Sequence, residues 1–114
     1  MSVFNLDGTF DHRFAEGGNL KAPWGMAVAP SSFGPLAGKL LIGNFGDGHI
    51  NAFDPDSGAF IDQVRDSNGK PIVIDGLWAL QVGTATTCGT HTVCFTAGPN
   101  DEKDGLFGSL NPNP

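Results

Sequence analysis

Hydrophobic and polar positions alternate over short runs along this chain, a pattern typical of β-strands that are buried on one face. Residues 3–14 carry Phe on either side of an Asp7-Gly8 turn, which predicts a hairpin of two short strands. Residues 52–64 repeat the scheme with an aromatic residue, an acidic turn that contains Gly, and a second strand that contains Phe60. The sequence therefore predicts the same hairpin twice.

A second repeat links two segments that begin with tryptophan. Small and apolar residues follow Trp24 up to Ala29, and a similar run follows Trp78 up to Gly83. The repeat distance is about 50 residues, and a period of this size with only strand signals indicates the blades of a β-propeller. We expect the two tryptophans to fill the cores of the blades, with a ligand platform as the alternative role.

The predicted fold is all-β, a β-propeller fragment of about two blades. Residues 1–114 form one partial propeller unit, with an outer-strand hairpin at 1–15, a complete blade at 22–66 and an incomplete blade at 76–111. The expected strands lie at residues 2–6, 9–14, 24–29, 39–44, 48–53, 59–64, 77–82, 92–97 and 105–110.

The two incomplete ends are complementary, because the first supplies outer strands and the second supplies inner strands. Unpaired strand edges invite association, and a hairpin passed to the next copy gives a head-to-tail contact that closes when the rotation fits. Three copies of about two blades would close a ring of about six blades. We therefore expect a homotrimer, with a four-bladed dimer or an eight-bladed tetramer as the alternatives.

Composition and charge narrow the possible partners. The chain has 114 residues with 17 Gly and 8 Pro, which suits one domain of short strands and frequent turns. Its 12 acidic and 6 basic residues give a formal charge of −6, which disfavours nucleic acid and anionic membranes as partners. The sequence shows no signal segment and no apolar run of about 20 residues, so we expect a soluble chain whose localisation is undetermined.

Cys88 and Cys94 flank a segment of five residues, a spacing that would place them across the mouth of a hairpin. A disulfide is one interpretation. Two reduced cysteines at strand ends are the other, because a bridge that closes so short a loop adds little stability. A metal site that also uses His91 lacks the paired ligand spacing that is usual for zinc.

Residues 20–30 and 38–54 resemble an NHL-type repeat, with a Pro-x-Gly approach, an inner strand, a Gly turn, an apolar strand and a strand that ends in Phe-Asp. More narrowly, the chain resembles the C-terminal part of a bacterial family of uncharacterised six-bladed propellers, often exported and sometimes carrying a PEP-CTERM sorting tail. This resemblance implies an NHL-like six-bladed fold. The motifs that carry it lie at residues 33–35, 43–48, 74–80 and 95–108.

The turns on one face of the expected blades are rich in oxygen ligands and include one imidazole. The candidate metal ligands are Asn44, Asp47, His49, Asp101 and Asp104. Carboxylate and amide oxygens suit Ca²⁺, and an added imidazole suits Zn²⁺, so one of these divalent metals is the expected cofactor. The alternative is that the two Asp-Gly pairs only form turns and that the other acids are solvated.

Two functions fit these residues. The chain has no Ser-His-Asp order, nucleophile elbow, phosphate loop or dinucleotide fingerprint, which disfavours a covalent serine mechanism. A metal-dependent hydrolase would use Asp47 and His49 as catalytic residues, and its ion would activate water against a small ester, lactone, phosphoester or phosphotriester. Likeness to lactone- and phosphotriester-hydrolysing propellers supports this by fold-level analogy. The alternative is a non-catalytic propeller that binds glycans or proteins at repeated grooves and gains avidity from copy number.

Overall fold

The computed structural model describes residues 1–111, and in these residues all nine expected strands are present. Every strand pairing within the sheets is antiparallel, so the all-β fold class is confirmed. The strands form three sheets of two, four and three strands, whose order in space follows their order in the chain. Neither described helix is long and apolar enough to cross a membrane.

The first sheet is a hairpin of β1 (Ser2–Phe4) and β2 (Phe10–Arg13). The second contains β3 (Pro23–Val28), β4 (Leu40–Asn44), β5 (Ile50–Phe53) and β6 (Phe60–Gln63). The third contains β7 (Leu77–Val82), β8 (Val93–Ala97) and β9 (Leu106–Leu110). Two single-turn helices, η1 (Gly34–Leu36) and α1 (Pro99–Glu102), lie in connections between strands.

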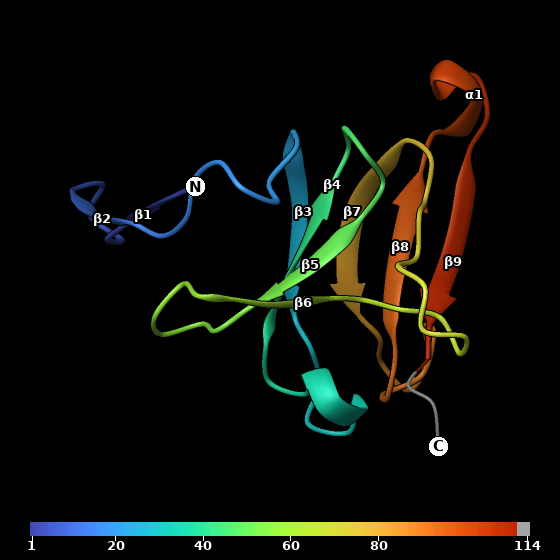
Figure 1. The fold of residues 1–114 in the computed structure, drawn as a ribbon. Coiled ribbons are helices and arrows are strands. Elements are labelled where there is room, and N and C mark those ends of the chain that lie inside the picture. The colour runs from blue at the N-terminus through green and yellow to red at the C-terminus, as the bar shows by residue number, and fades with distance from the viewer. Residues whose placement is uncertain (112–114) are drawn as a thin grey trace.

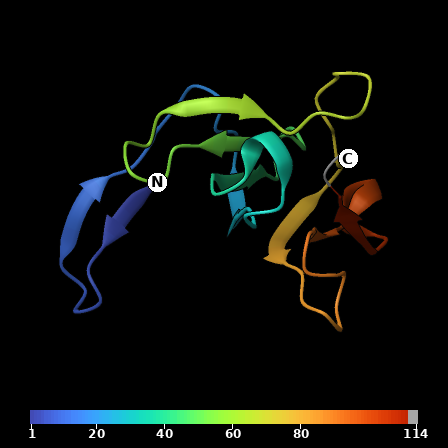
Figure 2. The ribbon, with the colours of Figure 1, turned by 90° about the horizontal axis from the view of Figure 1, so that it is seen from below.

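The three sheets follow one another along an arc (Figure 2). The hydrophobic core lies between the second and third sheets, where Leu41, Ile50, Leu77 and Val93 have no exposed surface. The β1–β2 hairpin stands apart from this core, on the far side of the second sheet (Figure 1). The four-stranded and three-stranded sheets thus form the body of the molecule, and the hairpin projects from it.

The second and third sheets approach so closely that a glycine is required at the crossing of β3 and β7. A Cβ atom on Gly25 would lie 2.6 Å from the carbonyl oxygen of Trp78, a backbone atom that has little room to move. Burial of apolar surface at about 25 cal/mol per Å² favours this contact. The two sheets are therefore packed as one body.

The β1–β2 hairpin has the same internal geometry as the β5–β6 hairpin. Phe4 pairs with Phe10 and Phe53 pairs with Phe60, and in each hairpin a register irregularity lies just before the first Phe. The ring centroids are 5.7 Å and 5.9 Å apart, both with edge-on geometry. The doubled hairpin predicted from the sequence is thus present, with the aromatic pair in equivalent places.

The third sheet repeats the first three strands of the second sheet. In the second sheet Leu40 pairs with Phe53, and in the third Val93 pairs with Leu110, so that β8 corresponds to β4 and β9 to β5. The turn before each of these third strands is an Asp-Gly pair. Among the described residues, β9 has no counterpart of β6 on its outer side.

Candidate functional site

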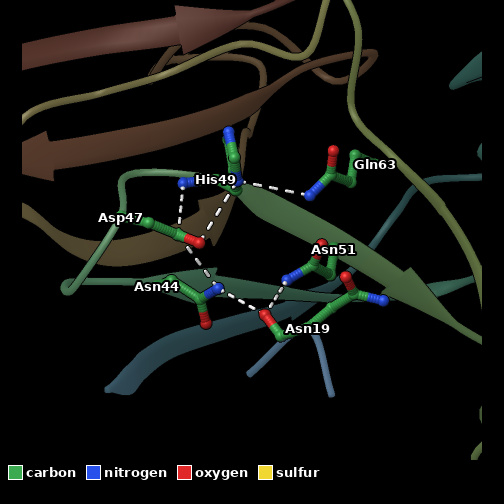
Figure 3. A network of polar contacts seen from close by, with 6 residues as sticks. All are labelled: Asn19, Asn44, Asp47, His49, Asn51 and Gln63. Carbon is green, nitrogen blue, oxygen red and sulfur yellow. Dashed lines mark hydrogen bonds and ion pairs between the residues drawn. The ribbon is translucent and has the colours of Figure 1, made fainter. Parts of the chain in front are cut away.

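Asn44, Asp47 and His49 lie together where β4 turns into β5 (Figure 3). The Asp47 Oδ1 atom accepts hydrogen bonds from the backbone N–H of His49 over 3.0 Å and from the Asn44 side-chain amide over 3.1 Å. The other oxygen, Oδ2, lies 3.2 Å from His49 Nδ1. Asp47 therefore stabilises the turn, in the way that aspartate commonly does.

The electrostatics of Asp47 reflect these contacts. Burial raises the pKa of the Asp47 carboxyl, but the hydrogen bonds from the His49 N–H and the Asn44 amide, with the adjacent His49 ring, lower it. The net result is a pKa below the ordinary value of 3.8, so the carboxylate is charged at neutral pH. His49 is 28% exposed, and its Nδ1 atom also contacts the Gln63 amide nitrogen at 3.3 Å.

Two buried asparagines extend this network. The side-chain amides of Asn44 and Asn51 both donate to the backbone carbonyl of Asn19, over 2.8 Å and 3.0 Å. Neither asparagine is exposed, and within residues 1–111 their Oδ1 atoms have no hydrogen-bond partner. The contacts fix the segment that leads from the β1–β2 hairpin to β3.

Asp101 and Asp104, the other two candidate ligands, lie on the connection between β8 and β9. The Asn100 N–H donates to Asp75 Oδ2 over 3.1 Å, and the Asn100 side chain contacts Asp104 Oδ2 at 3.4 Å. Asp101 has a φ of 54°, in the left-handed region between two residues that share it. These side chains form a second polar group, separate from the hydrogen-bond network around Asp47.

The described side chains do not form a metal centre within one chain. No group of three or more His, Cys, Asp and Glu residues among residues 1–111 is arranged to hold a metal ion. Both oxygens of Asp47 have contacts within the turn, and Asp101 and Asp104 lie on the connection between β8 and β9, away from Asp47. The Ca²⁺ or Zn²⁺ site, and the metal-dependent hydrolase that relies on it, therefore stay predictions.

Cys88 and Cys94 are joined by a disulfide, which is the first of the two interpretations of their spacing. The Thr92 hydroxyl donates to the Cys88 carbonyl over 2.7 Å, inside the closed loop. The ring of His91 contacts the Ser32 hydroxyl, which lies on the loop that follows β3. The loop closed by the disulfide thus connects the third sheet to the loop that follows β3 of the second sheet, through the contact between His91 and Ser32.

A cavity of about 500 Å³ lies between the end of β6 and the end of β9. Its apolar lining includes Phe33 and Val64, which are buried, and Leu110 at the end of β9. Its polar rim includes Arg65, whose guanidinium contacts Asp62 and the Gly69 carbonyl. The cavity thus combines an apolar floor with a charged rim.

Sequence reasoning missed Asn51 and Gln63 as members of the Asp47 network. A signal for Asn51 exists, since it is a polar residue in the middle of the apolar strand β5, and buried polar groups need partners. Gln63 follows the ordinary alternation of an outer strand, and no pattern distinguishes it from a solvent-facing residue.

Three proteins of Acanthamoeba polyphaga mimivirus, each described as uncharacterised, are similar to this chain. Two are 43% and 41% identical over 110 residues, or 96% of the chain, and the third is 35% identical over 111 residues, or 97%. The chain spans only 28%, 26% and 20% of the length of these relatives. No protein-family model matches the chain, and no solved structure matches it.

The similar proteins are viral, so the predicted relationship to a bacterial NHL-like, PEP-CTERM-associated propeller family is wrong. The reason for the error is physical. Pro-x-Gly approaches and Asn/Asp-Gly turns are demanded by the backbone of many antiparallel sheets, so they report the type of turn and do not identify a family. The motifs supported the all-β fold class and nothing narrower.

Proposed function

We propose that this chain is a non-catalytic binding module that assembles with copies of itself through its β1–β2 hairpin. The observation that carries the proposal is a difference between two equivalent aromatic residues. Phe53, in the β5–β6 hairpin, is 4% exposed, whereas Phe4, at the same place in the β1–β2 hairpin, is 59% exposed. The β5–β6 hairpin is the edge of the four-stranded sheet, where Phe53 lies against the rings of Phe14 and Phe60, whereas the equivalent surface of the β1–β2 hairpin is exposed.

The exposed surface of the hairpin is larger than Phe4 alone. Phe10 is 57% exposed, and Leu6 at the turn is fully exposed. A hairpin of two strands is marginally stable in water, and its unpaired edges invite another strand. Association buries the aromatic pair and pairs one of these edges, so that binding and stabilisation of the hairpin occur together.

The proposed module gains from copy number. A particle built from identical copies presents the same surface several times, and a glycan or protein with repeated features would bind it with increased avidity. A homotrimer, the assembly expected from the sequence, remains our proposal for the copy number. The size of the particle distinguishes it from a dimer or a tetramer.

The proposal is tested by the mass of the particle in solution. Sedimentation velocity and light scattering of the chain should give a mass near 36 kDa for a trimer, against 11.9 kDa for one copy. The double variant Phe4→Ser/Phe10→Ser should shift the mass to that of one copy while the fold of the body is retained. Val73→Ser is the matched control, because Val73 is 63% exposed but lies outside the hairpin.

A wild-type chain that is folded and has the mass of one copy across a wide concentration range would refute the proposed function. An assembly that persists in the double variant would assign the association to a different surface.

A further inference from the structure

The disulfide between Cys88 and Cys94 joins a fixed part of the chain to a loop. Cys94 lies in β8, between its partners Gln81 of β7 and Ser109 of β9, and only 2% of it is exposed. Cys88 is half-buried and lies in the connection between β7 and β8. Because strands hold Cys94 on both sides, the loop that carries Cys88 is the part that is released when the bridge opens.

Apart from the bridge, few contacts hold the loop of residues 84–91. Most of its residues are exposed, and its backbone hydrogen bonds join loop residues to one another. Among residues 1–111, the hydrogen bonds that attach it to the rest of the chain involve the hydroxyl of Thr92 and the ring of His91. The Thr92 hydroxyl has a single proton, shared between the carbonyls of Cys88 and Gly89 over 2.7 Å and 2.8 Å. The bridge is therefore the main constraint on this loop.

The ring of His91 is the point at which this loop meets the second sheet. Its Nδ1 atom contacts the hydroxyl of Ser32, on the connection between β3 and β4. Both side chains are exposed, so water competes for the same hydrogen bond, and its net contribution is small unless the two groups are held together. His91 lies midway between the two cysteines in the sequence, within the ring that the bridge closes. The bridge thus supplies the constraint that the contact needs.

We propose that the bridge acts as a redox-sensitive latch between the second and third sheets. In the oxidised chain it holds His91 against Ser32, and in the reduced chain the loop of residues 84–91 and the connection that follows β3 are released from each other. The body stays folded, because the core between the two sheets is formed by other residues, such as Leu41 and Leu77. The latch does not rest on the proposed assembly.

A small thiol would open the latch by exchange. Its thiolate attacks Sγ of Cys88, which is the more accessible of the two cysteines. A bond forms between the reagent sulfur and Cys88, the bond to Cys94 breaks, and Cys94 keeps the electron pair and takes up a proton. A second thiolate of the reagent then attacks the reagent sulfur of this mixed disulfide and releases Cys88 as a thiol. Two reagent thiols are thereby oxidised to a disulfide, and the bridge is reduced to two thiols.

The test measures amide hydrogen exchange in the full chain with and without dithiothreitol, with thiol titration to confirm that the bridge has opened. The reporter is the Phe33 amide, which donates to the Pro30 carbonyl beside Ser32. Reduction should speed the exchange of this amide about fivefold, the effect of one lost hydrogen bond. The Gly69 amide, in the turn that follows β6, is the internal control and should keep its rate.

Three variants separate the bridge from the contact that it supports. His91→Ala keeps the bridge and removes the ring, so its Phe33 amide should already exchange at the faster rate and should not respond to reduction. Thr90→Ala is the matched control, at an exposed neighbour in the same loop, and should behave like the wild type. Cys88→Ser/Cys94→Ser should show the faster rate with or without the reductant.

A Phe33 amide that exchanges equally fast in the oxidised and the reduced wild type would overturn the proposal. A response to reduction that persists in His91→Ala would overturn it as well, because the bridge would then act without this contact. An equal rise at Gly69 would show that reduction loosens the chain as a whole, which contradicts a latch at one end of the two sheets.

Discussion

Asn44 and Asn51 are joined through a single acceptor, because both side-chain amides donate to the backbone carbonyl of Asn19. The two asparagines come from neighbouring strands, β4 and β5, and neither has any exposed surface. A carbonyl oxygen has two lone pairs, so one atom satisfies both donors. The arrangement links the middle of the four-stranded sheet to the segment that carries the hairpin.

Replacement of Asn51 by Asp should destabilise the chain more than replacement by Leu. Asp puts a second oxygen opposite the Asn19 carbonyl in a buried position, which should cost about 3 kcal/mol or more. Leu loses one hydrogen bond but also removes the unpaired Oδ1 atom, for a net cost of about 1 kcal/mol. Urea unfolding of the two variants measures the difference. Equal costs would show that Asn51 does not donate to Asn19 in solution.

The charge of Asp47 should contribute stability that depends on pH. Its pKa is lower in the folded chain than its ordinary value of 3.8, so the folded state binds the proton less readily than the unfolded state. The contribution is present in full above the unfolded pKa and is lost as the pH falls through the folded pKa.

The difference in unfolding free energy between the wild type and Asp47→Asn should therefore be constant near neutral pH and shrink at pH values below about 4. Chemical unfolding of both proteins over that range measures it. A difference that stays unchanged in acid would mean that the charge of Asp47 does not stabilise the turn.

The metal prediction from the sequence can be decided by elemental analysis. We expect His49→Ala and the wild type to have the same metal content after dialysis against Ca²⁺ or Zn²⁺, because the Asp47 carboxylate is held by two hydrogen bonds in the turn and no further acidic residue joins it and His49 in a group of three ligands among residues 1–111. His12→Ala, on the exposed strand β2, is the matched control. One ion per chain that is lost in His49→Ala and kept in His12→Ala would support the metal site.

The left-handed conformation of Asp101 predicts a response to glycine. Asp101 has a φ of 54°, at which a Cβ atom causes steric repulsion that glycine avoids. Asp101→Gly should thus be more stable than Asp101→Ala by about 1 kcal/mol, since both variants remove the same carboxylate. Thermal unfolding compares them. An alanine variant that is as stable as the glycine variant would argue against the left-handed backbone.

Reduction of the disulfide between Cys88 and Cys94 should destabilise the chain modestly. The bridge closes a short loop and so restricts the conformations of the unfolded chain. Without it the unfolded state gains entropy, which should lower the free energy of unfolding by about 2 kcal/mol. Unfolding with and without a reducing agent measures this cost. The Cys88→Ser/Cys94→Ser variant should already have the lower stability and should not respond to the reductant.

The strands could be predicted because their signals are local. The turn between β4 and β5 needs a residue that tolerates positive φ, and Gly48, with a φ of 76°, follows the aspartate that accepts the turn's hydrogen bonds. The same locality explains the error about the family. Turn chemistry constrains a few residues at a time, and many unrelated sheets impose the same constraint.

The candidate site was predicted only in part, for a related reason. Asp47 and His49 are two residues apart, so their proximity follows from the turn that they form. The Asn19 contacts span 25 and 32 residues, and the acceptor is a backbone carbonyl that any residue type would supply. No pattern of side chains encodes such a contact, and only the fold reveals it.

The contacts of Asn19 also bear on how readily the hairpin could find a partner. A segment that is free to move loses about 1–2 kcal/mol of backbone conformational entropy per residue when an interface fixes it. The segment that connects the hairpin to β3 is already fixed by its hydrogen bonds to the body before a second copy binds. Its backbone entropy is therefore lost on folding and not on association. Because the hairpin is held in one orientation, ordering it costs less free energy on binding, and the affinity is higher. Loosening the segment by Asn44→Ala would therefore weaken association without altering a single residue of the interface.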